Sequence, residues 1–161
     1  MDMVAEDVAD SVFGDLADWQ SMLDRHDEVF SGMLPGAAVG FVPRAGSGIQ
    51  PGKHVAGLVA ANGAGDMMVW KIVGTRMQAS MRRYTGFQEC KVDLLFVTED
   101  EAVQAMHEAL QDGNASLSVM KRQIRKGSIM FYVMRTKYEL QDAGYEEFLD
   151  TLGLAFLGAC R

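Results

Sequence analysis

Short apolar runs alternate along this chain with turn-forming residues and with longer stretches in which apolar residues recur at helical spacing. The clearest pair of runs is His54–Ala61 and Met67–Val73, which flank the turn-forming stretch Asn62–Asp66. Apolar and β-branched runs on either side of an Asn-Gly turn are the strongest short-range sign of a β-hairpin. We therefore expect a hairpin here, with the remaining strands and helices arranged around it.

Helices are predicted near both ends of the chain. Between residues 3 and 30, apolar side chains recur every three or four positions and acidic side chains lie between them, a pattern typical of an amphipathic helix. Gly14 could divide this helix, because an interior glycine weakens a helix by about 1 kcal/mol relative to alanine. Residues 145–157 predict a closing helix, although Gly153 leaves open a last short strand at Leu154–Gly158.

Further strands are predicted from apolar runs in the first, middle and last thirds of the chain. These runs are Ala37–Pro43, Lys91–Val97 and Ser128–Lys137. Two other stretches, Gly74–Tyr84 and Ala115–Met120, fit either a strand or a helix, because their apolar residues satisfy both periods. Together with the hairpin, these runs supply enough strands for one sheet.

A change of apolar period at Thr98 predicts one more helix, which continues to Gly113. Thr98 and Glu101 have the spacing of a capping box, in which the threonine hydroxyl and the glutamate each satisfy a free backbone amide. This structural role accounts for the acidic residues at the start of the helix, so we assign them no chemistry.

The order of these elements predicts an α+β fold. We expect a mainly antiparallel sheet or half-barrel, with a leading N-terminal helix and a closing C-terminal helix. At 161 residues the chain is most simply a single domain. Within it we distinguish an acidic N-terminal helical segment, residues 1–33, from an α+β body, residues 34–161.

Charge is distributed unevenly along the chain. The formal net charge is -7, yet residues 1–31 hold nine acids against the single base Arg25, while residues 113–137 hold six bases and no acid. The acidic total argues against general affinity for nucleic acid, but a local basic face can still hold a phosphate-bearing partner. The bases of the second segment are Lys121, Arg122, Arg125, Lys126, Arg135 and Lys137.

Six cations form the candidate site for anionic lipid or another anion. Near an anionic membrane surface each Lys or Arg contributes roughly 1 kcal/mol. The four cations at residues 121–126 lie just before Gly127, so we expect them to project from a loop. The two arginines at residues 82 and 83 could form a second wall of the same site. The plainer alternative is a solvated basic edge that blocks strand-to-strand aggregation. The candidate residues are Arg82 and Arg83, followed by Lys121, Arg122, Arg125 and Lys126.

No pattern in the sequence identifies a catalytic, metal or cofactor site. The glycine-rich stretch Arg44–Lys53 lacks the spacing and the following hydroxyl residue of a phosphate loop. The three histidines, at 26, 54 and 107, have no other ligands at the spacing that zinc sites use. We therefore expect a non-enzymatic module without a metal or a cofactor.

The location of the protein is inferred from three features. The acidic N-terminus does not resemble a signal peptide, and no apolar run reaches the roughly 20 residues that span a bilayer. Two widely separated thiols, Cys90 and Cys160, do not make a disulfide framework and fit a reducing compartment. We expect a cytoplasmic protein, peripheral at a membrane if it binds lipid.

The order of segments resembles the SYLF lipid-binding domain. The resemblance rests on a small-residue strand ending in proline, a glycine-rich unit with a turn, an apolar strand running into an acidic helix start, and a closing glycine-rich segment. The chain departs from the family at Gln78–Gln88, which holds one glycine where the family has several. The matching stretches are Pro35–Pro43, Val55–Trp70, Leu94–Val103 and Gly153–Ala159.

The resemblance implies non-enzymatic binding of phosphoinositide or another anionic lipid. The basic N-terminal helix that contributes to lipid binding in that family is acidic here, so its role is not carried over, and the candidate cations come from the charge distribution alone. The alternative function is a protein-interaction adaptor or chaperone-like module. In that case the acidic helix is either the contact surface or an internal cover for the basic face. The sequence does not predict an oligomeric state.

Overall fold

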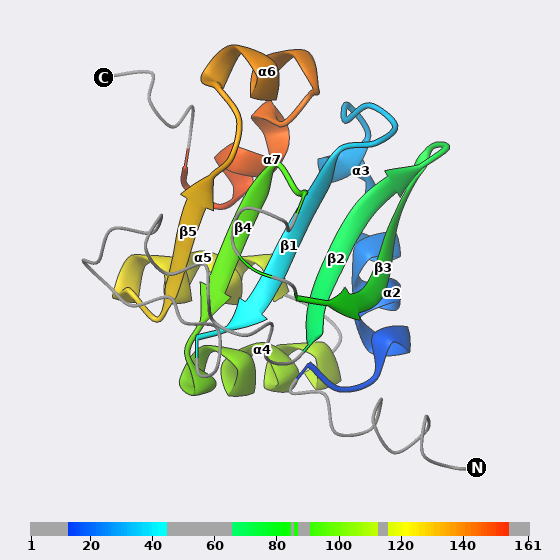
Figure 1. Ribbon diagram of the computed structural model, residues 1–161. Helices are drawn as coiled ribbons and strands as arrows, with labels where there is room; N and C mark the ends of the chain where they lie inside the picture. Colours follow the sequence, from blue (N-terminus) through cyan, green and yellow to red (C-terminus); the bar gives the residue numbers. More distant parts are fainter. Residues whose placement is uncertain (1–12, 45–65, 85, 87–90, 113–115, 155–161) are drawn as a thin grey trace.

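The computed structural model describes residues 13–44, 66–84, 86, 91–112 and 116–154, and within them the chain forms a five-stranded open sheet (Figure 1). The strand order is β3-β2-β1-β4-β5. β1 and β4 are parallel, and the other neighbouring strands are antiparallel. The strands are β1 (Ala38–Pro43), β2 (Asp66–Val73), β3 (Arg76–Arg83), β4 (Leu94–Thr98) and β5 (Ile129–Val133).

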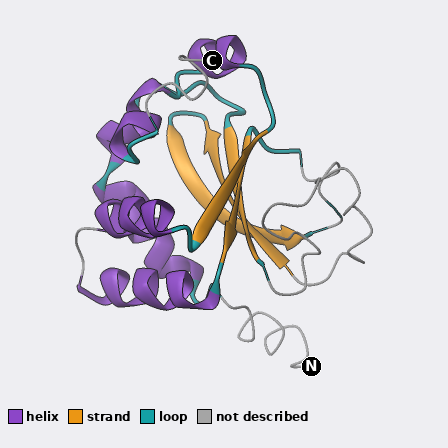
Figure 2. Ribbon diagram, turned by 90° about the vertical axis from the view of Figure 1, so that its left-hand side faces the viewer, coloured by secondary structure: helices purple, strands orange, loops and turns teal. Residues whose placement is uncertain are grey.

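Most of the described helices lie on one side of the sheet (Figure 2), and one short helix, residues 137–142, lies beyond one end of the strands (Figure 1). Helices precede β1 and follow β5, so the predicted α+β fold with a mainly antiparallel sheet and helices at both ends is confirmed. The helices are α2 (Leu16–Arg25), α3 (Asp27–Phe30), α4 (Asp100–Asp112), α5 (Ser116–Lys126), α6 (Lys137–Asp142) and α7 (Glu146–Thr151).

An aromatic core lies between the sheet and the helices. Trp70 on β2 is fully buried, and its ring centroid lies 4.5 Å from that of Phe41 on β1. Phe41 in turn stacks on Phe96 of β4 with the centroids 5.0 Å apart. Aromatic pairs in this range add to the stability that burial alone provides. The central strands are therefore fixed to one another through their helix-facing side chains.

The other face of the sheet carries a second, smaller apolar cluster. Gly40 lies in this face, where a Cβ would meet the Met67 side chain at 2.5 Å, so a glycine lets the chains approach closely. The buried members of the cluster are Ala38, Val42, Met67, Val69, Tyr84, Val92, Leu95 and Val97. Both faces of the central strands are thus apolar, which explains why their sequences run apolar without strict alternation.

Of the predicted hairpin of His54–Ala61 with Met67–Val73, only the second arm lies within the described residues, where it forms β2. Both hydrogen-bonding edges of β2 are occupied, by β1 over Met68–Lys71 and by β3 over the whole strand. The hairpin of β2 is instead closed by Gly74 and Thr75. Gly74 has a φ of +68°, which suits the first turn position of a two-residue hairpin.

Most predicted elements are present with altered ends. Residues 3–30 yield α2 and α3, while their first ten residues lie outside the described part, and Gly14 has a φ of +75° directly before α2. The ambiguous stretch Gly74–Tyr84 forms a strand, β3, and the described part of Ala115–Met120, which begins at Ser116, belongs to a helix, α5. The closing helix ends at Thr151 because Gly153 adopts a φ of +76°.

The predicted capping box at Thr98 is wrong. Thr98 is the last residue of β4, and its hydroxyl donates to the carbonyl oxygen of Val42 on β1 at 3.2 Å. The carbonyl of Glu99 accepts the first helical hydrogen bonds of α4 instead. A capping box does occur at α6, where Thr136 and Glu139 satisfy each other's backbone amides.

Candidate anion-binding site

Helix α5 brings the four later candidate cations onto one face. Lys121 and Arg125 are four positions apart, as are Arg122 and Lys126, and Arg122 and Arg125 are three apart; these spacings make side chains neighbours on a helix. We call these four residues the cationic stripe. They project from a helix and not from the predicted loop, because Leu117 and Met120 on the opposite face are buried in the core and continue the helical period.

Three residues of the cationic stripe have no counter-charge within the described part of the chain. Lys126 forms an ion pair with Glu101 of α4 at 3.2 Å. For Lys121, Arg122 and Arg125 the described residues provide neither an ion pair nor a side-chain hydrogen bond. The stripe and Ser118 line a shallow hollow of about 430 Å³. An anion entering this hollow would meet three cations that have no counter-charge among the described residues.

Two residues of the cationic stripe also stabilise the helix that carries them. Arg125 and Lys126 occupy the last turn of α5, where cations interact favourably with the negative end of the helix dipole. Lys121 and Arg122 lie further from that end and gain less from the dipole. The stem of Lys121 packs beside Gly153, since a Cβ there would lie 3.1 Å from Lys121 Cε.

Arg82 and Arg83 lie elsewhere, at the end of β3. β3 and β5 are the two outer strands of the described sheet, so four strand spacings, or about 19 Å, separate them. Because α5 packs against β5, Arg82 and Arg83 do not converge with the cationic stripe. Arg83 is opposite Asp66 of β2 in the strand register.

The acidic N-terminal segment contacts the β3 side of the sheet. Asp24 of α2 pairs with Arg76 of β3 through two contacts, Nε to Oδ1 at 3.1 Å and Nη2 to Oδ2 at 2.9 Å. The bonded guanidinium lowers the pKa of Asp24. The acidic helix therefore neutralises Arg76, which lies on the same strand as Arg82 and Arg83, and α2 packs against β3 and α4.

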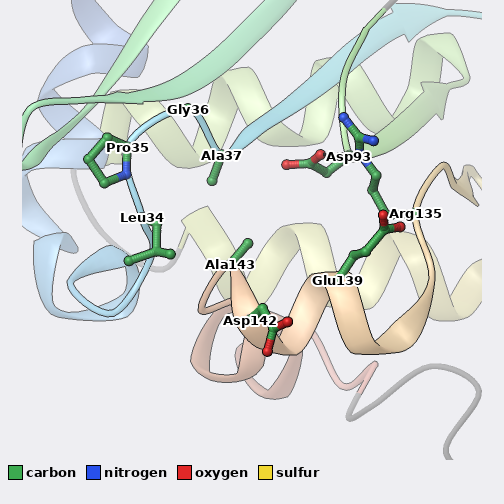
Figure 3. A pocket seen from close by; sticks show the side chains of 9 residues that line it. All are labelled: Leu34, Pro35, Gly36, Ala37, Asp93, Arg135, Glu139, Asp142 and Ala143. Atoms are coloured by element: carbon green, nitrogen blue, oxygen red, sulfur yellow. Dashed lines mark hydrogen bonds and ion pairs between the residues drawn. The ribbon is translucent and has the colours of Figure 1, made fainter.

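A groove of about 400 Å³ opens at the start of β1. Figure 3 shows residues 34–37 along one side of this groove and α6 side chains along the other, with Asp93 and Arg135 at one end. Asp93 Oδ1 accepts a hydrogen bond from Arg135 Nε at 2.9 Å. Its Oδ2 accepts from the backbone N–H of Ala38 at 3.1 Å and from the Tyr145 hydroxyl at 2.6 Å.

This network is satisfied within the fold. Burial, and next the bond to Asp93, raise the pKa of Tyr145 well above its ordinary value, so the hydroxyl stays protonated and serves as a donor. Both carboxylate oxygens of Asp93 are occupied by protein donors. We therefore assign Asp93, Arg135 and Tyr145 a structural role. No sequence pattern predicts this network, since Asp93 and Tyr145 are 52 positions apart.

Neither a metal site nor a membrane-spanning helix is present among the residues that the structure describes. In that part of the chain, no three His, Cys, Asp or Glu side chains are grouped so as to hold a metal ion. None of the helices described there is long and apolar enough to span a bilayer. Cys90, Cys160 and His54 lie outside the described residues.

Comparison with known proteins gives distant likenesses of fold. No protein-family model and no curated protein matches the sequence, so the SYLF resemblance stays a prediction. A UbiJ-SCP2 ubiquinone synthesis protein aligns with a TM-score of 0.39 and 9% identity, over 86% of this chain and 93% of that one. Sterol carrier protein 2 from Yarrowia lipolytica, in its apo form, aligns with a TM-score of 0.34 and 10% identity, over 96% of this chain and 91% of that one. Both are too distant to assign a ligand to this chain.

Proposed function

We propose that this chain is a non-enzymatic binding module that holds anionic lipid headgroups on the cationic stripe of α5. The observation that carries the proposal is the gathering of Lys121, Arg122 and Arg125 on one helix face without a counter-charge among the described residues. Guanidinium groups suit phosphate because they donate in parallel pairs, and lysine adds a point charge. For this function the protein would lie in the cytoplasm, at the periphery of a membrane.

The expected affinity is modest. At roughly 1 kcal/mol for each cation near an anionic surface, the three cations without a counter-charge among the described residues supply about 3 kcal/mol, or about a hundredfold in the binding constant. Lys126 contributes less because Glu101 competes for it. Such a surface binds reversibly and depends on the density of anionic lipid, as expected of a peripheral module.

Vesicle binding by a matched pair of variants tests the proposal. The first variant carries Arg122→Gln and Arg125→Gln, and the second carries Arg82→Gln and Arg83→Gln, so each loses two positive charges. With vesicles of phosphatidylserine and phosphatidylcholine, we expect the first variant to bind about ten- to thirtyfold more weakly than the unaltered chain. The second should bind nearly as well as the unaltered chain, because its positions lie at the other edge of the sheet.

Equal binding by the unaltered chain and the Arg122/Arg125 variant would overturn the proposal. A titration with inorganic phosphate separates a membrane site from a site for a free anion. Binding of phosphate without binding of vesicles would identify the stripe as a free-anion site. If neither ligand binds, and Asp18→Asn with Asp27→Asn on the exposed side of the acidic helical segment abolishes binding of a protein partner to the folded chain, the adaptor alternative is favoured.

A further inference from the structure

The two outer strands of the described sheet differ in how their free edges are treated. The side-chain amide of Gln20, on α2, lies along the outer edge of β3. Its Nε2 donates to the Met77 carbonyl oxygen and its Oε1 accepts from the Ala79 N–H, both at 2.9 Å. Gln20 thus occupies backbone groups that an added strand would use. β3 also carries arginines at both ends, which discourage pairing with another strand.

β5 has no such side-chain cover among the described residues, and its cations lie outside the strand and not within it. Its five residues, Ile129 to Val133, are all apolar and include no charge and no proline. Val133 is 40% exposed, and the three residues before it are half-buried. An apolar edge strand without a charge, a proline or a cover is the kind that accepts another strand. In the described part of the chain, no strand pairs with the outer side of β5.

The backbone geometry identifies which groups of β5 face outward. The N–H of Glu99 donates to the Ser128 carbonyl at 2.8 Å, and the N–H of Met134 donates to the Asp93 carbonyl at 2.9 Å. Residues 128 and 134 therefore direct their backbone groups toward β4. Because successive residues of a strand direct these groups to opposite edges, residues 130 and 132 also face β4.

The N–H and C=O groups of Ile129, Phe131 and Val133 consequently point to the free edge. Within the described residues these groups have no hydrogen-bond partner. They form an evenly spaced row of donors and acceptors at the spacing that a sixth strand requires.

We propose that the outer edge of β5 accepts an extended segment of a partner protein by strand addition, and that this segment is apolar in its middle and acidic at its ends. Main-chain hydrogen bonds supply the affinity in this mode of recognition, and alternate side chains supply the specificity. The acidic ends follow from the charge around β5. Arg125 and Lys126 precede the strand, and Arg135 and Lys137 follow it. Lys126 already pairs with Glu101 and Arg135 with Asp93. The acidic ends of the partner would therefore meet chiefly Arg125 and Lys137, which form no ion pair within the described residues.

The same charges argue against a second copy of this chain as the occupant. An antiparallel pair of β5 strands centred on Phe131 would bring Arg125 and Lys126 of one copy beside Arg135 and Lys137 of the other. Like charges on adjacent strands destabilise a pairing. A strand with acidic ends meets favourable charges at the same places. This inference concerns the β5 edge alone and stands whether or not the cationic stripe binds lipid.

A titration followed by amide hydrogen exchange tests the inference on the full chain. The probe is a synthetic peptide of about ten residues, with alternating valine and threonine in the middle and two aspartates at each end. A second peptide replaces the aspartates with lysines. We expect the acidic-ended peptide to slow exchange at Ile129, Phe131 and Val133, and the lysine-ended peptide to have little effect.

Val133 offers a matched pair of variants. Val133→Pro removes one outward N–H and leaves the ladder with β4 intact, while Val133→Ala keeps that N–H and shortens the side chain. We expect the proline variant to bind the acidic-ended peptide about five- to tenfold more weakly than the alanine variant. Thermal unfolding of both variants verifies that they are folded, and the exchange titration of the unaltered chain with the two peptides remains the test should Val133→Pro fail to fold.

Three results would overturn the inference. The first is slow exchange of the three outward amides in the free monomer. The second is equal binding of the two peptides, which would remove the charge argument. The third is a concentration-dependent dimer that protects the same amides, which would identify a second copy as the occupant.

Discussion

The Tyr145 hydroxyl donates a 2.6 Å hydrogen bond to Asp93 Oδ2 and links the segment between α6 and α7 to the start of β4. The same carboxylate oxygen accepts the N–H of Ala38 at the start of β1. Tyr145 is fully buried, and the Asp93 side chain is 14% exposed. One tyrosine thus fixes the C-terminal helices to the only parallel pair of strands among the described ones.

Tyr145→Phe should destabilise the protein by about 1–3 kcal/mol, because it leaves a largely buried carboxylate without one of its donors. Urea denaturation measures the change as a shift of the midpoint at constant slope. Tyr138→Phe is the matched control, since Tyr138 is 68% exposed, and it should change stability by less than about 0.5 kcal/mol. Equal effects of the two substitutions would contradict the assigned role.

Alkaline pH should destabilise the unaltered protein more steeply than the Tyr145→Phe variant. Burial and the bond to Asp93 raise the pKa of Tyr145 in the folded state, whereas an unfolded tyrosine loses its proton near pH 10. Above that pH the unfolded state binds fewer protons than the folded state, so the free energy of unfolding falls as pH rises. Denaturation at pH values from about 8 to 11 measures the two slopes, and parallel slopes would refute the prediction.

Two glycines should differ sharply in their response to alanine. Gly144 has a φ of +86°, and a Cβ there would lie 1.9 Å from the backbone oxygen of Gly32. Since backbone cannot move aside, Gly144→Ala should cost more than about 3 kcal/mol. Gly40→Ala meets mainly the flexible end of Met67 and should cost about 1–2 kcal/mol. Thermal and urea unfolding of both variants provide the comparison.

Gln20→Ala should destabilise the protein by about 1–2 kcal/mol through the loss of both hydrogen bonds to the β3 edge. The amide of Ala79 loses its acceptor in this variant, so its hydrogen exchange should accelerate. Gln104→Ala, on the exposed side of α4, serves as the control. If Ala79 exchanges at the same rate in both variants, Gln20 does not protect the edge.

Salt should weaken vesicle binding without a comparable loss of folding stability. Screening shortens the reach of charges from about 10 Å at 0.1 M salt to about 3 Å at 1 M, and the cationic stripe lies on the surface. The aromatic core between sheet and helices is apolar and is not weakened by screening. Vesicle sedimentation and thermal unfolding at both salt concentrations check this. Salt-independent binding would indicate an apolar contact instead.

Local patterns predicted single elements well and pairings poorly. Ala37–Pro43 was predicted as a strand and is β1 almost residue for residue, because its apolar run ends at a proline. The partner of β2 could not be predicted in the same way. In the sequence, Gly74 and Thr75 are a weaker turn signal than Asn62–Gly65. Which strands pair with the two edges of β2 depends on the whole sheet and not on a local pattern.

The candidate site was predictable in composition and not in shape. Arg122 and Arg125 were recognisable as part of a basic run. That they project from a helix depended on Met120 and its neighbours, whose spacing also fits a strand. Their separation from Arg82 follows from the strand order, which no local pattern encodes. The Asp93–Tyr145 contact is of the same long-range kind.

The parallel pairing of β1 with β4 also affects how fast the protein folds. Ala38 and Asp93, at the start of this pairing, are 55 positions apart, whereas β2 and β3 are joined by a two-residue turn. A hairpin of the second kind forms in roughly 1–10 μs, but closing a long loop must precede any contact between β1 and β4. We therefore expect the β2–β3 hairpin to form early and the middle of the sheet to form last, so that the centre of the native structure sets the folding rate.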